Sequence, residues 1–156
     1  MINQVLIYNS GGGIGDALQI LPLINTLKLK IKDAKFYYLS AHENHFNTTL
    51  KEFNTKIETL NLDIKYFGFR WWHFIAVKNK IKKSKIDKFD LIIDLQSKIR
   101  NTLILKKIPH KYFISPCFNF KLSNPNLKLK KINKINHNVI QAINLILKTN
   151  YEIIDF

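Results

Sequence analysis

The chain has 156 residues, of which 46% are hydrophobic, so it has the length and apolar content of one ordinary folded domain and not of a disordered polymer. A single cysteine, Cys117, excludes an internal disulfide and a multi-cysteine metal cluster. The formal charge of +14 favours an anionic partner such as a phosphorylated glycolipid, a membrane surface or a nucleic acid. Lys, Ile and Asn are abundant throughout, so a compositional bias of the genome explains the charge equally well.

The N-terminus has the character of a core strand and not of an export signal. Residues 1–8 lack a positively charged start, and their apolar stretch is too short for a signal peptide. No uninterrupted apolar run reaches the roughly 18 residues that a membrane-spanning helix requires. Any membrane contact is therefore expected to be peripheral.

A strand, a glycine loop and a helix open the chain. Residues 5–8 are β-prone and lead through Asn9 and Ser10 into three consecutive glycines. From Asp16 apolar residues recur at helical spacing, and Pro22 should kink the first turns; the apolar positions are Ala17, Ile20, Leu21, Ile24, Leu27 and Ile31. Residues 35–39 form a second predicted strand, parallel to the first because a helix-length segment joins them.

Three elements are predicted in the middle of the chain. Residues 42–53 have a weak helical pattern, and residues 56–62 suggest a third strand. Residues 67–85 have the pattern of a basic amphipathic helix. Its apolar side would carry Phe67, Trp71, Phe74, Ile75 and Ile81, and its basic side Arg70, Lys78, Lys80, Lys82, Lys83 and Lys85.

The second half continues the alternation of strand and helix. Residues 89–95 form a strong buried-strand run, residues 96–107 a short helix with Ser97 as its cap, and residues 112–114 another strand. Residues 115–135 are expected to be irregular, and a final helix carries Val139, Ile140, Ile143, Ile146 and Leu147 behind a polar start at residues 136–138. The predicted architecture is α/β, an open parallel sheet with helices on both faces.

Ligands of such sheets bind beyond the carboxyl ends of the strands, where both the glycine loop and Asp94 fall. Glycines let the backbone approach a ligand closely, and the helix that follows offers unpaired N–H groups and a partial positive charge. Asp16 sits at this turn. It is either a helix-capping residue or an exposed base held towards substrate, and the residues alone do not decide between these roles.

Neither common nucleotide signature fits the loop. Gly11 and Gly13 match two glycines of the dinucleotide-binding fingerprint, but Asp16 occupies the third position and the second strand ends at Ser40 instead of an acid. No Gly-Lys-Ser or Gly-Lys-Thr follows, so the loop is not a Walker motif.

The stretch Gly12-Gly13-Ile14-Gly15-Asp16-Ala17-Leu18-Gln19-Ile20-Leu21-Pro22-Leu23 resembles the opening of glycosyltransferase family nine, the lipopolysaccharide heptosyltransferases, which have Gly-Asp followed by Leu-Pro. Residues 89–96 are similar to the family's hydrophobic strand ending in Asp-x-Gln, and His137 opens a helix resembling the one that closes its first domain. Ser97 departs from the family's usual glycine after Gln96.

The resemblance implies the Rossmann-like N-terminal half of a GT-B glycosyltransferase. Residues 1–150 would form the acceptor-side domain and residues 151–156 the start of the interdomain linker, with the C-terminal nucleotide-sugar domain absent from the chain. Asp16 aligns with the family's proposed base, which takes a proton from the acceptor hydroxyl in an inverting transfer that requires no metal. No cofactor is expected.

Several residues near the crevice are candidates for binding the acceptor. Gly13 and Gly15 would allow close backbone approach, whereas Asp94 more readily ties down the loop than touches a ligand. Donors to an acidic acceptor, or alternatively solvated or packing residues, are Gln96, Lys98, Arg100, Arg70 and Trp71. Trp71 and Trp72 are adjacent and cannot both lie in the core, so this cluster either docks on an anionic membrane or glycolipid or packs against the missing domain.

Metal binding is not predicted. His42 and His45 have a spacing that could hold a metal on a helix, but no further ligands converge on them. Cys117 is most simply a small apolar residue.

Three functions remain open from sequence. The first is acceptor recognition and proton abstraction in the transfer of heptose or another sugar from a nucleotide-sugar to a lipopolysaccharide core-type acceptor, at the cytoplasmic face of the bacterial inner membrane. The second is a non-catalytic domain that binds glycolipid or a separate C-terminal domain. The third, nucleic-acid binding, has charge and aromatic residues in its favour but no recognised module.

Overall fold

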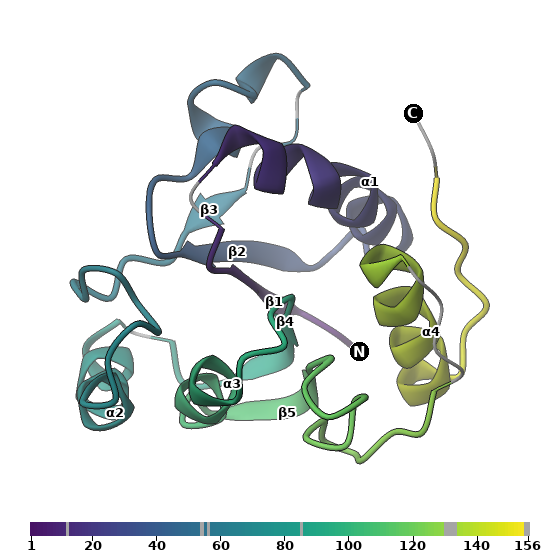
Figure 1. The fold of residues 1–156 in the computed structure, drawn as a ribbon. Helices are drawn as coiled ribbons and strands as arrows, with labels where there is room; N and C mark the ends of the chain where they lie inside the picture. Colours follow the sequence, from purple (N-terminus) through teal and green to yellow (C-terminus); the bar gives the residue numbers. More distant parts are fainter. Residues whose placement is uncertain (12, 54, 56, 85, 130–133, 155–156) are drawn as a thin grey trace.

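The computed structural model describes residues 1–11, 13–53, 55, 57–84, 86–129 and 134–154. A five-stranded sheet lies at its centre, in the order β3-β2-β1-β4-β5, and every neighbouring pair is parallel (Figure 1). The strands are β1 (Gln4–Asn9), β2 (Lys35–Ser40), β3 (Glu58–Thr59), β4 (Phe89–Asp94) and β5 (His110–Ile114). This confirms the predicted open parallel α/β sheet, with the strand order of a Rossmann-like fold.

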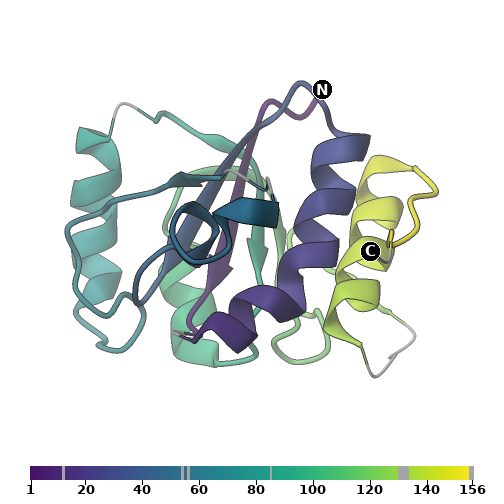
Figure 2. The same ribbon diagram turned by 90° about the horizontal axis from the view of Figure 1, so that it is seen from above.

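Helices cover both faces of the sheet, as predicted. In Figure 2 the sheet stands between α2 on one side and α1 with α4 on the other. The helices are α1 (Ile14–Lys30), α2 (His73–Lys83), α3 (Ile99–Leu105) and α4 (Ile135–Leu147). Pro22 lies inside α1, which visibly changes direction along its length in the same view, in agreement with the predicted kink.

Side chains of the central strand alternate between two cores. Val5 and Ile7 pack in the core beneath α1 and α4, whereas Leu6 and Tyr8 pack in the core beneath α2 and α3. All four are fully buried, because a central strand with helices on both faces has no solvent-facing side. The apolar run that predicted this strand from sequence therefore reflects burial on both faces.

The strand order reverses between β1 and β4, which lie side by side although α1, β2, β3 and α2 separate them in sequence. Tyr8 pairs with Asp94 in their register, so the two strands end together. The chain leaves β1 through Asn9 and leaves β4 through Leu95. These two connecting segments therefore diverge from neighbouring positions on the carboxyl edge of the sheet. This is where doubly wound sheets form their ligand crevice.

Two predictions for the segment between β2 and α2 need correction. Residues 42–53 form two short 3-10 turns, η1 (His45–Asn47) and η2 (Lys51–Phe53), instead of a helix. The Asn44 side chain accepts a hydrogen bond from the Phe46 N–H and so stabilises a turn that competes with a longer helix. The third strand has only two residues, Glu58 and Thr59, and pairs with β2 alone at the edge of the sheet.

The helix predicted over residues 67–85 begins only at His73. Gly68 has a φ of +90°, a conformation outside the helical region. Residues 65–72 therefore form turns and bends ahead of the helix. Of the predicted apolar side, Phe67 and Ile81 are buried and Phe74 packs against the core, but Trp71 and Ile75 are exposed. The buried stripe of α2 is His73, Val77 and Ile81. Lys85 lies outside the described residues.

The start of α3 also differs from the prediction. The helix predicted from residue 96 begins at Ile99, and Lys98, not Ser97, occupies the capping position without a side-chain capping bond. The irregular segment after β5 is observed as predicted over residues 115–129, and residues 130–133 lie outside the described part. Beyond α4, the Ile154 N–H donates to Thr26 Oγ of α1, so the chain returns over this helix. The assignment of residues 151–156 to a linker stays a prediction.

Candidate active site

The glycine loop places Asp16 in the first turn of α1, at the carboxyl end of β1. Gly13 precedes the helix in an extended conformation, and its N–H donates to Asp16 Oδ2 over 3.4 Å. This contact is half of a capping box, which agrees with the capping role considered from sequence. The Asp16 side chain is nevertheless exposed at the crevice, so one cap contact does not remove it from solvent or from a ligand.

Gly11 is required by the carboxylate that follows it. A Cβ atom built on Gly11 would collide with the Asp16 carboxyl group, whereas a Cβ atom on Gly15 would meet no atom within 4 Å. The Gly11 N–H also donates to Asn9 Oδ1 over 3.1 Å. The loop therefore uses a glycine to let its backbone pass close to its own acid, and Gly15 opens onto free space. Gly12 lies outside the described residues.

Asn9 joins the two strand ends of the crevice, a role that the sequence interpretation missed. Its side chain is only 4% exposed. Asn9 Oδ1 accepts from Gln96 Nε2 at 2.9 Å, while Asn9 Nδ2 donates to the Asp16 carbonyl at 3.4 Å. The available signal was a polar residue that ends an apolar strand directly before a glycine loop.

Asp94 is fully buried behind this crevice. One carboxyl oxygen accepts from the Gln96 N–H at 2.9 Å, and the other accepts from Thr102 Oγ at 2.7 Å and Ser115 Oγ at 2.8 Å. Burial raises the pKa of the Asp94 carboxyl to about 7, although these three hydrogen bonds oppose the rise. These contacts are the ones expected of a residue that ties down loops, and its place in acceptor binding stays a prediction.

The other predicted donors lie at the start of α3 and before α2. Lys98 is exposed, and the partly buried Arg100 donates through Nε to the Gly68 carbonyl at 2.7 Å. Arg70 is exposed, and Trp71 is 59% exposed. No hydrogen bond within the described ranges joins Arg70 or Trp71 to the Asp16 loop. The structure thus brings together Asp16, Asn9 and Gln96, and separately ties Arg100 to the loop that carries Arg70.

A buried polar cluster holds this second loop against the sheet. Tyr8 donates its hydroxyl to the Phe67 carbonyl at 3.0 Å, and Asn101 Nδ2 donates to the Tyr8 oxygen at 3.2 Å. Gly68 donates its N–H to His73 Nδ1 at 3.1 Å. Burial, with the nearby Arg100 and Arg70 charges, lowers the pKa of His73, and burial also raises the pKa of Tyr8. Both side chains are therefore neutral at neutral pH and act as anchors.

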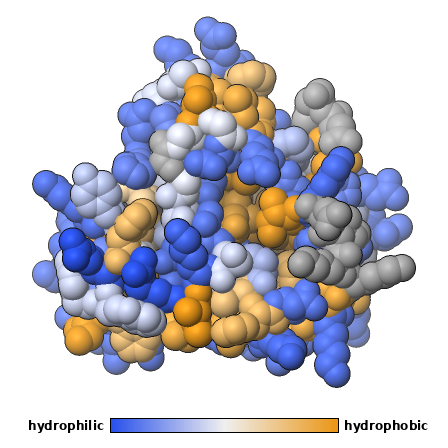
Figure 3. Space-filling view, viewed as in Figure 1, coloured by the Kyte–Doolittle hydropathy of each residue, from blue (hydrophilic) through white to orange (hydrophobic). Residues whose placement is uncertain are grey.

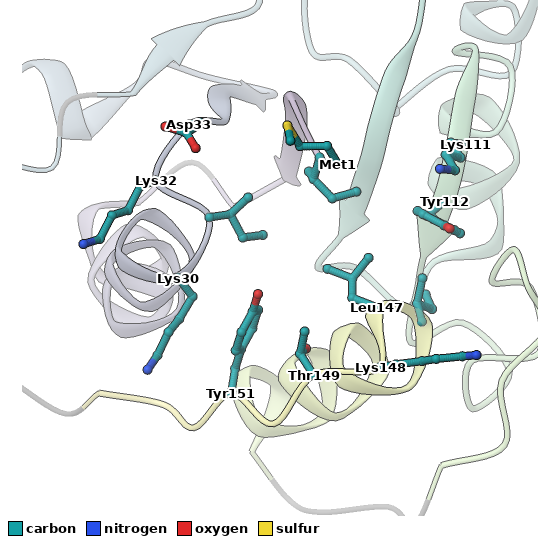
Figure 4. Close-up of a pocket in the computed structure, with 13 residues that line it drawn as sticks. Met1, Lys30, Lys32, Asp33, Lys111, Tyr112, Leu147, Lys148, Thr149 and Tyr151 are labelled. Atoms are coloured by element: carbon teal, nitrogen blue, oxygen red, sulfur yellow. The ribbon is translucent and has the colours of Figure 1, made fainter.

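The sheet also has a cavity of about 550 Å³ at its opposite, amino-terminal edge. Figure 4 shows the Tyr151 hydroxyl pointing into this cavity, whereas the amine ends of Lys30, Lys32 and Lys148 point away from it. Surface amines directed outward do not form a binding site. A second cavity of about 600 Å³ is lined by the ends of β2 and β3 and the segment after each, including Ser40, His42 and Asp63.

Two minor predictions concerned metal and thiol chemistry. Across the described ranges, no three His, Cys, Asp or Glu side chains gather as metal ligands. His45 Nδ1 lies 3.2 Å from Glu43. Cys117 is buried and free, and burial raises the pKa of its thiol.

None of the described helices is both long and apolar enough to cross a bilayer.

The fold is that of the N-terminal half of a GT-B glycosyltransferase. No protein-family model and no curated protein matches the chain by sequence. Solved structures match it with TM-scores of 0.64 for a family 9 glycosyltransferase from Veillonella parvula DSM 2008 and 0.63 for the E. coli heptosyltransferase WaaC with ADP-2-deoxy-2-fluoro heptose. WaaC with ADP matches with a TM-score of 0.60.

Sequence identities are 15%, 16% and 14%, and the matches cover 98%, 97% and 96% of this chain. They cover 46%, 50% and 49% of the solved chains, so this chain spans about half of their length. The predicted resemblance to glycosyltransferase family nine is confirmed at the level of the fold.

Proposed function

We propose that this chain is the acceptor-side half of an inverting glycosyltransferase that transfers heptose or another sugar from a nucleotide-sugar to an acidic, lipopolysaccharide core-type acceptor. One observation carries the proposal: the exposed Asp16 carboxylate in the crevice where the strand order reverses. The fold likeness to heptosyltransferase structures supports it.

Asp16 would act as the general base. Its carboxylate would take the proton from an acceptor hydroxyl as that oxygen attacks the anomeric carbon of the donor sugar. The bond from the anomeric carbon to the nucleoside diphosphate breaks on the opposite side, and its electron pair leaves with the diphosphate. Configuration is inverted, and the protonated Asp16 afterwards releases its proton to solvent.

The surrounding residues would position this base and the acceptor. Asn9 donates to the Asp16 backbone carbonyl, and Gly11 leaves room for the Asp16 carboxyl group. Gln96 links Asn9 to the end of β4. The backbone at Gly13 and Gly15 would lie against the acceptor. Asp94 would act through Gln96, because its carboxylate is buried. Donors to an acidic acceptor would be Lys98, Arg100, Arg70 and Trp71.

The donor nucleotide would be bound mostly by a second domain. The chain spans about half of the solved glycosyltransferases that it matches, and one of these carries ADP. We propose a C-terminal α/β domain, joined at residues 151–156 or supplied as a separate chain, as the partner that completes the crevice. The complete enzyme would work at the cytoplasmic face of the inner membrane, where a lipid-linked acceptor is available.

The direct test is sugar transfer by the chain completed with its C-terminal domain, followed as nucleoside diphosphate release with a phosphorylated glycolipid acceptor. Asp16→Asn keeps a side-chain oxygen that can accept the Gly13 N–H, so the fold should persist while turnover falls by about a hundredfold or more. Asp33→Asn, in the exposed turn after α1, is the matched control and should retain activity. Substantial turnover by Asp16→Asn would remove Asp16 from the base role.

Two other outcomes would favour the alternatives. Glycolipid binding without turnover in the completed protein would indicate a non-catalytic binding domain. Tighter binding to DNA than to glycolipid, with an affinity that falls steeply between two salt concentrations, would indicate a nucleic-acid-binding protein.

A further inference from the structure

An exposed aromatic surface lies beside the crevice. It consists of the loop before α2 and the outward side of that helix, and we refer to it as the aromatic-basic surface; its members are Tyr66, Phe69, Arg70, Trp71, Trp72, Ile75, Lys78, Lys82 and Lys83. Trp72 is 60% exposed and Ile75 is 71% exposed, where a soluble domain would ordinarily bury them. Figure 3 shows hydrophobic and hydrophilic side chains interspersed over this part of the molecule.

The outward side of α2 combines apolar and cationic residues. His73, Val77 and Ile81, four residues apart, face the core. Ile75, Lys78 and Lys82 lie on the opposite, exposed side of the helix. An α-helix with one buried stripe and an outward row of lysines around an isoleucine can lie flat on a charged interface.

Hydrogen bonds hold the backbone of the loop before α2, residues 66–72, against the rest of the domain. The Gly68 carbonyl, within the loop, accepts a hydrogen bond from Arg100 Nε, and the Gly68 N–H donates to His73 Nδ1. Phe67 is buried, and its carbonyl accepts from Tyr8. The backbone that presents Trp71 and Trp72 is therefore anchored to β1 and α3, so presenting them requires little ordering on binding.

The charge of this region has one sign. Residues 64–86 contain no Asp or Glu and seven basic residues: Lys65, Arg70, Lys78, Lys80, Lys82, Lys83 and Lys85. The neighbouring Asp63 lies 3.6 Å from Lys80, and within the described part of the chain no ion pair involves Lys78, Lys82 or Lys83. An anionic surface complements this charge, and each lysine near such a surface strengthens the attraction.

We propose that the aromatic-basic surface docks on an anionic lipid bilayer. Tryptophan and tyrosine suit the headgroup level, where one part of the ring is apolar and the other wet, and the lysines meet acidic headgroups. In Figure 2, α2 forms the side of the domain furthest from α4. The loop before α2 follows the carboxyl end of β3 and lies beside the crevice, whereas Lys78 and Lys82 lie further along α2.

Docking in this way would bring the crevice close to the membrane. Arg100, at the start of α3, contacts the same loop that carries the aromatic residues, and Gln96 at the crevice is only four residues before it. The lipid interaction does not depend on catalysis. Its use for presenting a lipid-linked acceptor to Asp16 rests on the proposed function.

The two tryptophans of the chain, Trp71 and Trp72, both belong to this surface, so intrinsic fluorescence reports on it alone. The full chain is titrated with phosphatidylcholine vesicles and with vesicles containing about one third phosphatidylglycerol, without any glycolipid. We expect a blue shift and co-sedimentation with the anionic vesicles, weakened by salt, and neither with phosphatidylcholine alone.

Matched variants locate the interaction. Lys78→Glu with Lys82→Glu should lower the vesicle affinity by at least about tenfold, and Trp72→Ser should also lower it. Lys111→Glu with Lys148→Glu changes net charge by the same amount at the opposite edge and should have a much smaller effect. Circular dichroism of each variant checks that the fold is retained.

Three results would overturn the proposal. They are an unchanged tryptophan spectrum with anionic vesicles, equal losses in the two lysine pairs, and a blue shift caused by a C-terminal domain but not by lipid. Asp16→Asn should bind vesicles like the natural chain. Loss of sugar transfer with vesicle binding retained would therefore contradict the proposed function and leave this inference standing.

Discussion

Asp16, in the first turn after β1, and Asp94, the last residue of β4, lie at the same edge of the sheet, yet their carboxyl groups lie in opposite environments. Asp16 is exposed and accepts one long hydrogen bond from its own loop. Asp94 is fully buried and accepts three hydrogen bonds from three segments of the chain. Topology therefore brings both acids to the crevice, but burial decides which one can meet a ligand.

The largest effect should be a pH dependence due to Asp94. The folded protein keeps this carboxyl protonated up to a pKa of about 7, whereas the unfolded chain releases the proton near its ordinary value of 3.8. Between these pH values the folded state binds more protons, so the free energy of unfolding falls as pH rises, by at most about 4 kcal/mol. Urea denaturation across this window should show the fall in the natural chain and not in Asp94→Asn. Parallel profiles for the two proteins would contradict the buried, shifted carboxyl.

Replacing each acid by alanine should lower the free energy of unfolding by different amounts. Asp94→Ala leaves the Thr102 and Ser115 hydroxyls without their shared acceptor and opens a small cavity, so we expect a loss of about 3 kcal/mol. Asp16→Ala removes one exposed capping contact and should cost about 1 kcal/mol or less. Midpoints of urea unfolding at one pH measure both. Equal losses would mean that Asp16 is as structural as Asp94.

The glycine loop provides a matched pair of smaller changes. A methyl group on Gly11 collides with the Asp16 carboxyl group, so Gly11→Ala should cost about 1 to 3 kcal/mol and displace that side chain. Gly15→Ala meets open space inside α1 and should be neutral or stabilise by up to about 1 kcal/mol. Thermal melting compares the two. In the completed enzyme, lost activity in a stable Gly15→Ala would place acceptor against this glycine.

The smallest effect should come from the bridge between the two strand ends. Gln96→Ala removes the 2.9 Å hydrogen bond to Asn9 Oδ1, which still accepts from the Gly11 N–H. We expect a loss of about 0.5 to 1.5 kcal/mol. Gln96→Leu, of similar size, checks whether packing or the hydrogen bond matters. If both variants match the natural chain, Asn9 and Gln96 do not couple the two ends.

Strong, locally encoded elements were the ones that sequence predicted well. The runs that became β1 and β4 are apolar at almost every position because both faces are buried, and α1 and α4 carry long helical periodicities. The segment before α2 failed because its pattern is helical whereas Gly68 adopts a positive φ that sequence does not display. Its carbonyl and N–H are instead satisfied by Arg100 and His73, through contacts 32 and five residues away.

The candidate site divides in the same way. Position at a strand end, together with the glycine loop and the Asp-x-Gln resemblance, marked Asp16, Asp94 and Gln96 as candidates from sequence alone. Asn9 was missed because its significance is its reach across the sheet to Gln96, 87 residues away. The local sequence pattern around Asn9 does not predict such a contact.

By itself, the sequence determined the order of strands and helices, the excess of positive charge and the acid in the glycine loop, since these follow from local periodicity and composition. Only the tertiary structure decided which carboxylate is exposed, which side of α2 faces solvent, and that both tryptophans lie at the surface. Those properties depend on which distant segments pack together. Burial and hydrogen bonding across the sheet therefore set the character of Asp16 and Asp94, although their places in the chain are so alike.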